Sequence, residues 1–218
     1  MYQPAHFRID DPVAQQALIA AHPLATLVVP TDAGLEINHL PLLHDAERGL
    51  LLGHVARANP VWQAAPRGDA VAVFHGPQAY VTPTWYPSKR EHGKVVPTWN
   101  YAAVHVHGQL RWIDDEAWLH TLVSRLTEAH ETAHAASLRA AGATPPPAWQ
   151  VDDAPTDYLH TMRGAIVGLE LAITRIEGKF KLSQNRPAAD VDGVVDGLRA
   201  RGDEASAALT TALRPLRR

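Results

Sequence analysis

Apolar and polar side chains alternate over residues 104–112, and this feature limits most strongly how the chain can fold. Successive residues of a strand point to opposite faces, so alternation with a period of two predicts a strand that is buried on one face only. The polar face of this strand begins with His105 and His107. Residues 165–175 alternate in a similar way, with Glu170 and Thr174 opposite an apolar row. The sequence therefore predicts two long, half-buried strands.

Shorter apolar runs with strand character precede the first of these strands, at residues 24–29, 35–40, 50–55 and 70–74. Proline, glycine and aspartate separate them, and these residues supply the fixed or positive backbone angles that turns need. Closely spaced short strands with few helices between them favour an antiparallel sheet or barrel over a doubly wound parallel sheet. We therefore expect a mainly β protein of the α+β class with flanking helices.

Helices are expected at three places around this sheet. Asp11 and Pro12 form a helix-start signal, and this helix would run to about residue 22. The acidic residues at 114–116 open a second helix, and a valine-rich pattern after Pro187 predicts a third. We expect the last residues, 214–218, to fray.

The composition excludes several classes of protein. The 218 residues include no cysteine, which excludes disulfide scaffolds, thiolate zinc sites, iron–sulfur clusters and thiol nucleophiles. The formal net charge of -3 lacks the basic balance of a dedicated nucleic-acid binder. The N-terminus has no signal-peptide core, and Glu170 interrupts the most apolar stretch. We therefore expect a soluble, cytoplasmic protein without a membrane partner.

An arginine at the end of one predicted strand is a candidate for phosphate binding. Arg57 is followed by Asn59 and Pro60, which initiate a helix or a turn. A guanidinium beside the free amides of a helix start can converge with them on one anion. A solvent-exposed turn arginine fits the same residues equally well, and the sequence leaves both interpretations open.

Two segments rich in aromatic residues and proline, 75–89 and 94–101, are candidates for binding a planar ring, because they can form a rigid, flat-walled surface. Sequence alone favours the alternative, in which they are stiff loops that cap a barrel or contact a partner subunit. A further segment at 177–187 carries Lys179 and Lys181 on one side, followed by hydroxyl and amide side chains. That combination can hold a phosphate or an oxidised ring edge.

A metal site at His105 and His107 is not expected. Imidazoles two residues apart on a strand can approach one ion, and His39, His54 and His75 are further candidates for a third ligand. No carboxylate accompanies the pair in the sequence, however, and a histidine on a half-exposed strand is more often simply hydrogen-bonded. The phosphate-loop, dinucleotide-turn and nucleophile-elbow motifs are also absent, so we assign no catalytic residue.

Together these segments resemble the PaiB family of FMN-binding negative transcriptional regulators. The resemblance covers residues 1 to about 200 and rests on five motifs in this order: Met1-Tyr2-x-Pro4-x-His6-Phe7, His54-Val55-Ala56-Arg57-Ala58-Asn59-Pro60, Gly76-Pro77-x-Ala79-Tyr80-Val81-x-Pro83-x-Trp85-Tyr86, Val96-Pro97-Thr98-Trp99-Asn100-Tyr101 and Gly178-Lys179-x-Lys181-Leu182-Ser183-Gln184-Asn185-Arg186-Pro187. The poorest match is the alanine-rich and proline-rich stretch from about 132 to 148.

The resemblance implies a split β-barrel, the fold of pyridoxamine phosphate oxidases and flavin reductases, assembled as a homodimer with FMN between the subunits. We expect the barrel domain at residues 1–187, with a helical insertion at about 114–162, and a C-terminal helical extension at 188–218.

The resemblance also implies which residues would contact FMN. By position within the motifs, the phosphate would meet His54, Arg57 and Asn59. Substitution of Arg57 by alanine should then weaken FMN binding, because a charge-assisted phosphate contact is lost. The remaining residues would line the flavin ring or close the site from the second subunit: Thr98, Trp99, Asn100 and Tyr101 for the ring, and Lys181, Ser183 and Gln184 for the closure.

A regulatory flavoprotein is the function that the resemblance implies, since the family name couples FMN with repression of genes for sporulation and degradative enzymes. The net charge and the lack of a recognisable DNA-reading helix argue against direct DNA binding, so we expect regulation through a small molecule or a protein partner. An FMN-dependent oxidoreductase of the flavin-reductase or pyridoxamine-oxidase type is the first alternative. A haem-binding split barrel is the second, because histidines are abundant.

Overall fold

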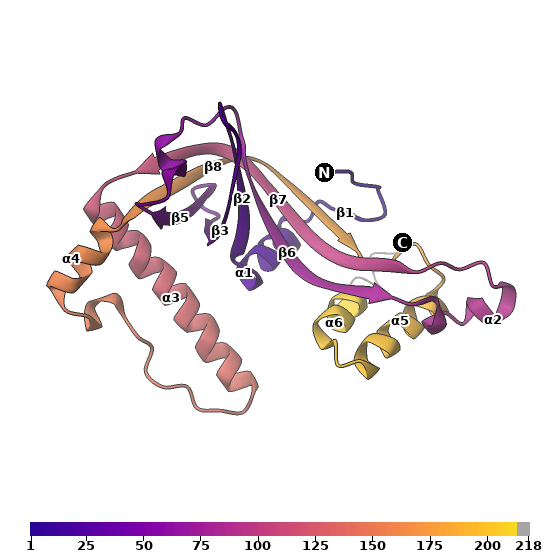
Figure 1. Ribbon diagram of the computed structural model, residues 1–218. Coiled ribbons are helices and arrows are strands. Elements are labelled where there is room, and N and C mark those ends of the chain that lie inside the picture. The colour runs from indigo at the N-terminus through magenta and orange to yellow at the C-terminus, as the bar shows by residue number, and fades with distance from the viewer. Residues whose placement is uncertain (213–218) are drawn as a thin grey trace. The chain divides into compact units, whose positions relative to one another are not determined.

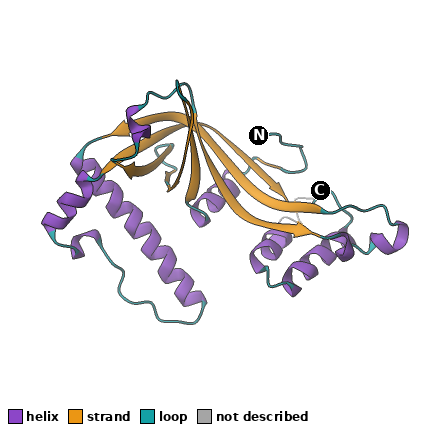
Figure 2. Cartoon of the chain, in the orientation of Figure 1, coloured by secondary structure: helices purple, strands orange, loops and turns teal. Residues whose placement is uncertain are grey.

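The computed structural model describes residues 1–212, in which eight strands and six α-helices are joined by turns, loops and three 3-10 helices (Figures 1 and 2). This part of the chain forms two compact units. The first unit consists of Met1–Ala25, Ala72–Val106 and the chain from Arg175 onward, and the second of Thr26–Val71 and His107–Thr174. The expected fraying at residues 214–218 lies outside the described residues.

The strands form a mainly antiparallel sheet. Their bounds are β1 Arg8–Ile9, β2 Leu24–Thr31, β3 Gly34–Pro41, β4 Leu43–Asp45, β5 Leu50–Ala56, β6 Ala70–Val81, β7 Thr98–Ile113 and β8 Ile166–Lys181. They are hydrogen-bonded in the order β3-β2-β6-β7-β8-β5-β4, and β1 pairs with β8. In the second unit β5 lies antiparallel to β8, with Leu51 opposite Leu171 and His54 opposite Gly168.

Helices α5 (Ala188–Ala200) and α6 (Glu204–Ala212) pack together in the first unit, where α1 (Pro12–Ala21) and α2 (Ser88–His92) also lie. Valines and Leu198 on one face of α5 bury against Val81 of β6 and against Tyr86, which follows the 3-10 helix η2 (Pro83–Trp85). The close approach depends on Gly197, because a Cβ there would overlap the ring of Trp85. This packing holds the end of β6 against one small core.

The second unit is built around the long helix α3 (Glu116–Ala140), and it also contains α4 (Thr156–Gly164) and two 3-10 helices, η1 (Pro60–Gln63) and η3 (Val151–Asp153). Asp115 caps α3 by accepting a hydrogen bond from the backbone amide of Trp118 at 2.7 Å. Leu122 and Leu126 of α3 bury against Leu50 and Leu52 of β5. The apolar face of α3 therefore anchors it to the sheet.

The structure confirms the expected fold elements and extends several of them. Helix α1 begins after Asp11 and helix α5 follows Pro187, as expected, whereas α6 was not anticipated. The expected strand at 70–74 continues to Val81. It includes a glycine and a proline that are typical of loops, but pairing with neighbouring strands keeps this segment extended. The domain boundaries at 1–187, 114–162 and 188–218 stay a prediction. Within residues 1–212, no helix combines the length and apolar character needed to span a membrane.

Candidate cofactor site

Lys181 is a half-buried residue at the end of β8, and its side chain contacts the start of β7 in the first unit. The Lys181 ammonium donates hydrogen bonds to the hydroxyl of Thr98 and, at 2.8 Å, to the carbonyl oxygen of Trp99. Burial lowers the pKa of Lys181, and the nearby charges of Lys179 and Arg186 lower it further. Three cationic side chains therefore create a positive potential here that suits an anionic group.

Beside this lysine, a buried polar pair fixes the chain where it leaves β8. The Ser183 hydroxyl contacts both atoms of the Asn100 amide, at 3.0 and 3.1 Å, and both residues are buried. Ser183 has φ 64°, the one positive value among the non-glycine residues that the structure describes. Left-handed backbone costs a residue with a Cβ about 1 to 2 kcal/mol, and such conformations cluster at functional sites.

The Gln184 amide closes the turn after Ser183. Its oxygen accepts a hydrogen bond from the backbone amide of Leu182 at 2.6 Å, and its nitrogen donates to the carbonyl of Phe180. Arg186 then lies over the ring of Tyr86, with 5.0 Å between the guanidinium carbon and the ring centroid. Gln184 thus holds the turn that carries Ser183, and Arg186 is placed by an aromatic ring.

Aromatic side chains of β6 and β7 border a shallow cavity of about 320 Å³ in the same unit. Its walls include His75 and Gln78 of β6 and Trp99 and Tyr101 of β7. Trp99 remains 54% exposed although Tyr80 contacts its ring edge to face at 6.3 Å. An exposed indole beside polar side chains is suited to a planar heterocycle.

Lys179 extends this aromatic wall with a positive charge. Its ammonium nitrogen lies 5.4 Å from the ring centroids of both Tyr2 and Tyr101. Contacts of this kind hold a cation in place without neutralising it. The first unit therefore combines a ring-binding wall with fixed cations, and this donor set fits a flavin that carries a phosphate.

Arg57 is held by the protein itself in the second unit. Its terminal nitrogens donate to both carboxylate oxygens of Asp114, at 2.8 and 2.5 Å, and its Nε donates to the carbonyl of Gly164 at 2.7 Å. The hydrogen bond to Asp114 raises the pKa of Arg57 and lowers that of the carboxyl. A phosphate at this guanidinium would have to share it with Asp114.

The two neighbours of Arg57 in the predicted phosphate group have different environments. Asn59 caps η1 through the amide of Val61 at 3.0 Å and donates to Asn38 at 2.6 Å. Burial lowers the pKa of His54, and its buried Nδ1 has no hydrogen-bond partner among the described residues. Burial therefore favours the neutral form of His54, and its Nδ1 is a polar atom that a ligand could satisfy.

The structure thus divides the ten predicted site residues into two groups. Seven lie in the first unit, where hydrogen bonds connect several of them, and His54, Arg57 and Asn59 lie in the second. His75, Gln78 and Arg186 lie within the candidate segments 75–89 and 177–187, but sequence reasoning assigned no individual role in flavin binding to them. The alternation of Lys179 with Lys181 was visible, but residues 75–81 gave no strand pattern because of their glycine and proline.

A larger cavity of about 480 Å³ lies in the second unit between α3 and residues 148–152. It contains none of the predicted site residues. Ser124, Thr127 and Glu128 of α3 contribute polar atoms to its wall, and Trp149 contributes a ring. Its composition does not match the cation-rich donor set of the first unit.

The sheet and its flanking helices define a split β-barrel, the class of fold expected above. The structure is similar to that of the flavocytochrome Anf3 of Azotobacter vinelandii, with a TM-score of 0.55 and 14% identity, over 80% of this chain and 69% of that one. At this level of identity the likeness concerns the fold, and it confirms the fold class.

Residues 1–175 match the family described as "Putative FMN-binding domain". The protease synthase and sporulation protein PAI 2 of Bacillus subtilis is 31% identical over 202 residues, which cover 91% of this chain and 89% of that protein. An uncharacterized protein of Emericella nidulans is 31% identical over 229 residues, covering 91% and 90% respectively. The chain therefore belongs to this FMN-binding family, which confirms the PaiB-type resemblance and FMN as the cofactor.

Proposed function

We propose that the first unit binds the flavin through its aromatic wall and its three cations. The observation that carries this proposal is the Lys181 ammonium, placed by Thr98 and Trp99 and held close to two further positive charges. Trp99 and Tyr101 would stack on or border the ring, and Lys181 would meet its anionic part. When bound, FMN supplies electron transfer in steps of one or two electrons.

The predicted phosphate contact at Arg57 is a separate part of this proposal. Because Asp114 already occupies both terminal nitrogens, His54 is the better candidate for a direct contact with the phosphate. Titration of FMN into variants of Arg57 and Lys181 distinguishes a role in binding from a role in folding.

We also propose that the protein works as a homodimer. The exposed Trp99 and Tyr80 leave an aromatic surface that a second copy or the flavin would cover. Light scattering of the purified chain with and without FMN measures the oligomeric state. A monomer in both conditions would contradict this part of the proposal.

The biological role that we propose is regulation without base-specific DNA recognition. The relationship to protein PAI 2, whose name refers to protease synthesis and sporulation, supports a regulatory role. The net charge of -3 argues against DNA as the direct target, so the flavin would report a redox state or a small molecule to another component. A mobility-shift assay over a range of salt concentrations tests this: specific binding with a steep salt dependence would instead identify a direct repressor.

An FMN-dependent oxidoreductase is the second candidate function. The cavity beside Trp99 is open, and His75 and Gln78 place polar groups where a small substrate could approach a bound ring. Turnover of NADH or NADPH by the FMN-loaded protein, followed by the loss of nicotinamide absorbance together with oxygen consumption, distinguishes an enzyme from a sensor. A rate no higher than that of free FMN would exclude this candidate.

A further inference from the structure

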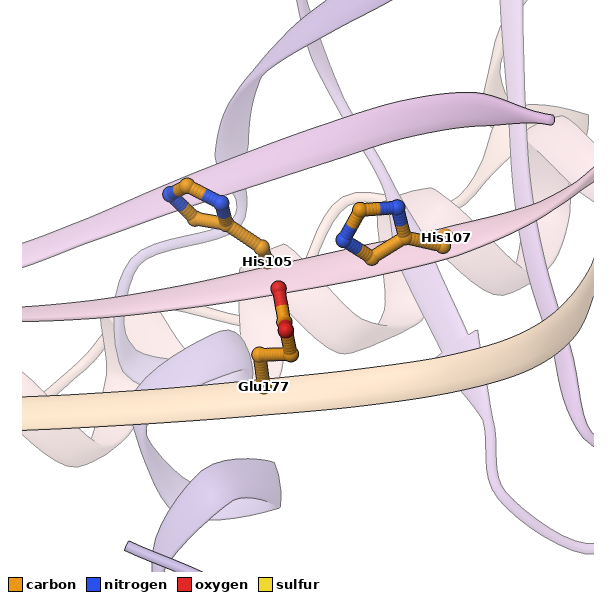
Figure 3. Close-up of side chains that lie close together, drawn as sticks. All are labelled: His105, His107 and Glu177. Carbon is orange, nitrogen blue, oxygen red and sulfur yellow. The ribbon is translucent and has the colours of Figure 1, made fainter. Parts of the chain in front are cut away.

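Two histidines and a glutamate have the composition of a metal site. None of them is among the residues proposed above to bind the flavin. His105 and His107 are two residues apart on the continuous strand β7 and so share a face, while Glu177 lies on β8. One ligand atom from each residue lies within 4.8 Å of the other two. Figure 3 shows the Glu177 side chain extending from β8 toward the two imidazole rings. We propose that these residues bind one divalent transition-metal ion, with zinc as the expected ion.

The donor set determines this choice of metal. Two imidazole nitrogens and one carboxylate oxygen suit zinc and its first-row neighbours, whereas calcium and magnesium prefer all-oxygen sites. Bonds of about 2.0 to 2.2 Å place the ligands of one ion roughly 3 to 3.5 Å apart, so small side-chain rotations would bring the three atoms into range. Three protein ligands would leave a coordination position for water or another small ligand.

Two cations already pair with the Glu177 carboxylate, and this limits its affinity for a metal ion. The amino group of Met1 lies 2.9 Å from Oε2, and Arg175 pairs with Oε1. Because the ion would compete with these partners for the carboxylate, we expect a micromolar rather than a nanomolar dissociation constant.

The ligands come from two separate parts of the sequence, the histidines from β7 and the glutamate from β8. The histidine pair alone did not predict a metal site, because the nearest candidate carboxylate in space comes from β8. The proposal is independent of flavin binding, since none of the three residues contacts Lys181 through a hydrogen bond described above or lines the cavity beside Trp99.

Calorimetric titration of zinc chloride into the tag-free full chain, treated with EDTA and desalted, tests the proposal. We expect saturable binding and a higher thermal midpoint with zinc. The variants His107→Gln and Glu177→Gln should each weaken zinc binding by about tenfold or more. Loss of a residue that only hydrogen-bonds to a metal ligand already weakens metal binding by about tenfold. Circular dichroism in EDTA checks that each variant folds.

The matched control is the double variant His130→Gln with His134→Gln. These two exposed histidines lie one turn apart on α3, so they form another pair of imidazoles to which zinc could bind. Retained binding in the double variant supports the proposal. Loss of binding there, unchanged binding in both cluster variants, or no zinc binding at all would overturn it.

If neither cluster variant folds, X-ray absorption at the zinc edge of the loaded double variant decides the question. A shell with two imidazole nitrogens supports the site on β7 and β8, and a shell without imidazole contradicts it.

Discussion

Arg57 binds Asp114 through both of its terminal nitrogens, so its guanidinium links the end of β5 to the residues that precede α3. The Nη2 atom also donates to the carbonyl of Ile166 at 3.1 Å, where β8 begins. An arginine used in this way stabilises the second unit, and this structural role is an alternative to the phosphate contact that the family resemblance implied.

Substitution of Arg57 by lysine should therefore lower the thermal midpoint and leave the FMN affinity within about twofold of the unaltered protein. Lysine keeps the charge but cannot make the bidentate contact with Asp114. Thermal unfolding and FMN titration, measured on the same preparation, check both effects. An unchanged midpoint with strongly weakened FMN binding would show that Arg57 is a phosphate ligand after all.

Mild acid should destabilise the protein through three half-buried histidines. Burial lowers the pKa of His22, His44 and His54, although the charge of Asp45 opposes this effect at His44. The unfolded chain therefore binds more protons than the native chain as the pH falls below about 6.5, so the free energy of unfolding decreases there. Urea unfolding between pH 8 and roughly pH 5 measures this slope. His54→Gln should reduce it, and an identical slope would contradict the assignment to His54.

Gly193 provides a test of the packing of α5. A Cβ at this position would overlap the carbonyl oxygen of Trp85, so Gly193→Ala should destabilise by about 1 to 3 kcal/mol despite the better helix propensity of alanine. Gly164 is the matched control, because it ends α4 and a Cβ added there would meet no atom within 4 Å. Gly164→Ala should be neutral or stabilise by up to about 1 kcal/mol. Equal effects of the two substitutions in chemical denaturation would refute the close contact.

Ser183 combines a buried hydrogen bond with left-handed backbone, and two substitutions separate these effects. Ser183→Ala removes the contact with Asn100 but keeps the strain, so it should destabilise by about 1 to 3 kcal/mol. Ser183→Gly removes both and should be more stable than the alanine variant by about 1 kcal/mol. The free energies of unfolding of the two variants provide the comparison. A glycine variant less stable than the alanine variant would show that φ at this position is not a source of strain.

The sequence predicted the elements whose signals are local. The alternation at 104–112 identified the middle of β7, and Asp11 with Pro12 identified the start of α1. The full length of β6 was not predictable, since the glycine and proline at positions 76 and 77 favour turns and only pairing with neighbouring strands keeps them extended.

The candidate site was only partly predictable for the same reason. Motifs pointed to Lys181 and Ser183, but the contacts that place them involve residues far away in the sequence, such as Asn100. The occupation of Arg57 by Asp114 is likewise a tertiary contact between distant residues. Charge and residue type indicate which side chains can bind an anion, whereas the fold decides which of them are already engaged.

The most direct measurement of the central claim is the visible absorption spectrum of the purified chain after incubation with FMN and gel filtration, run beside Lys181→Met. We expect flavin bands that co-elute with the unaltered protein, and an FMN affinity reduced about tenfold in the variant, which corresponds to roughly 1.4 kcal/mol. A haem band in place of flavin, or equal flavin retention by both proteins, would contradict the site proposed around Lys181.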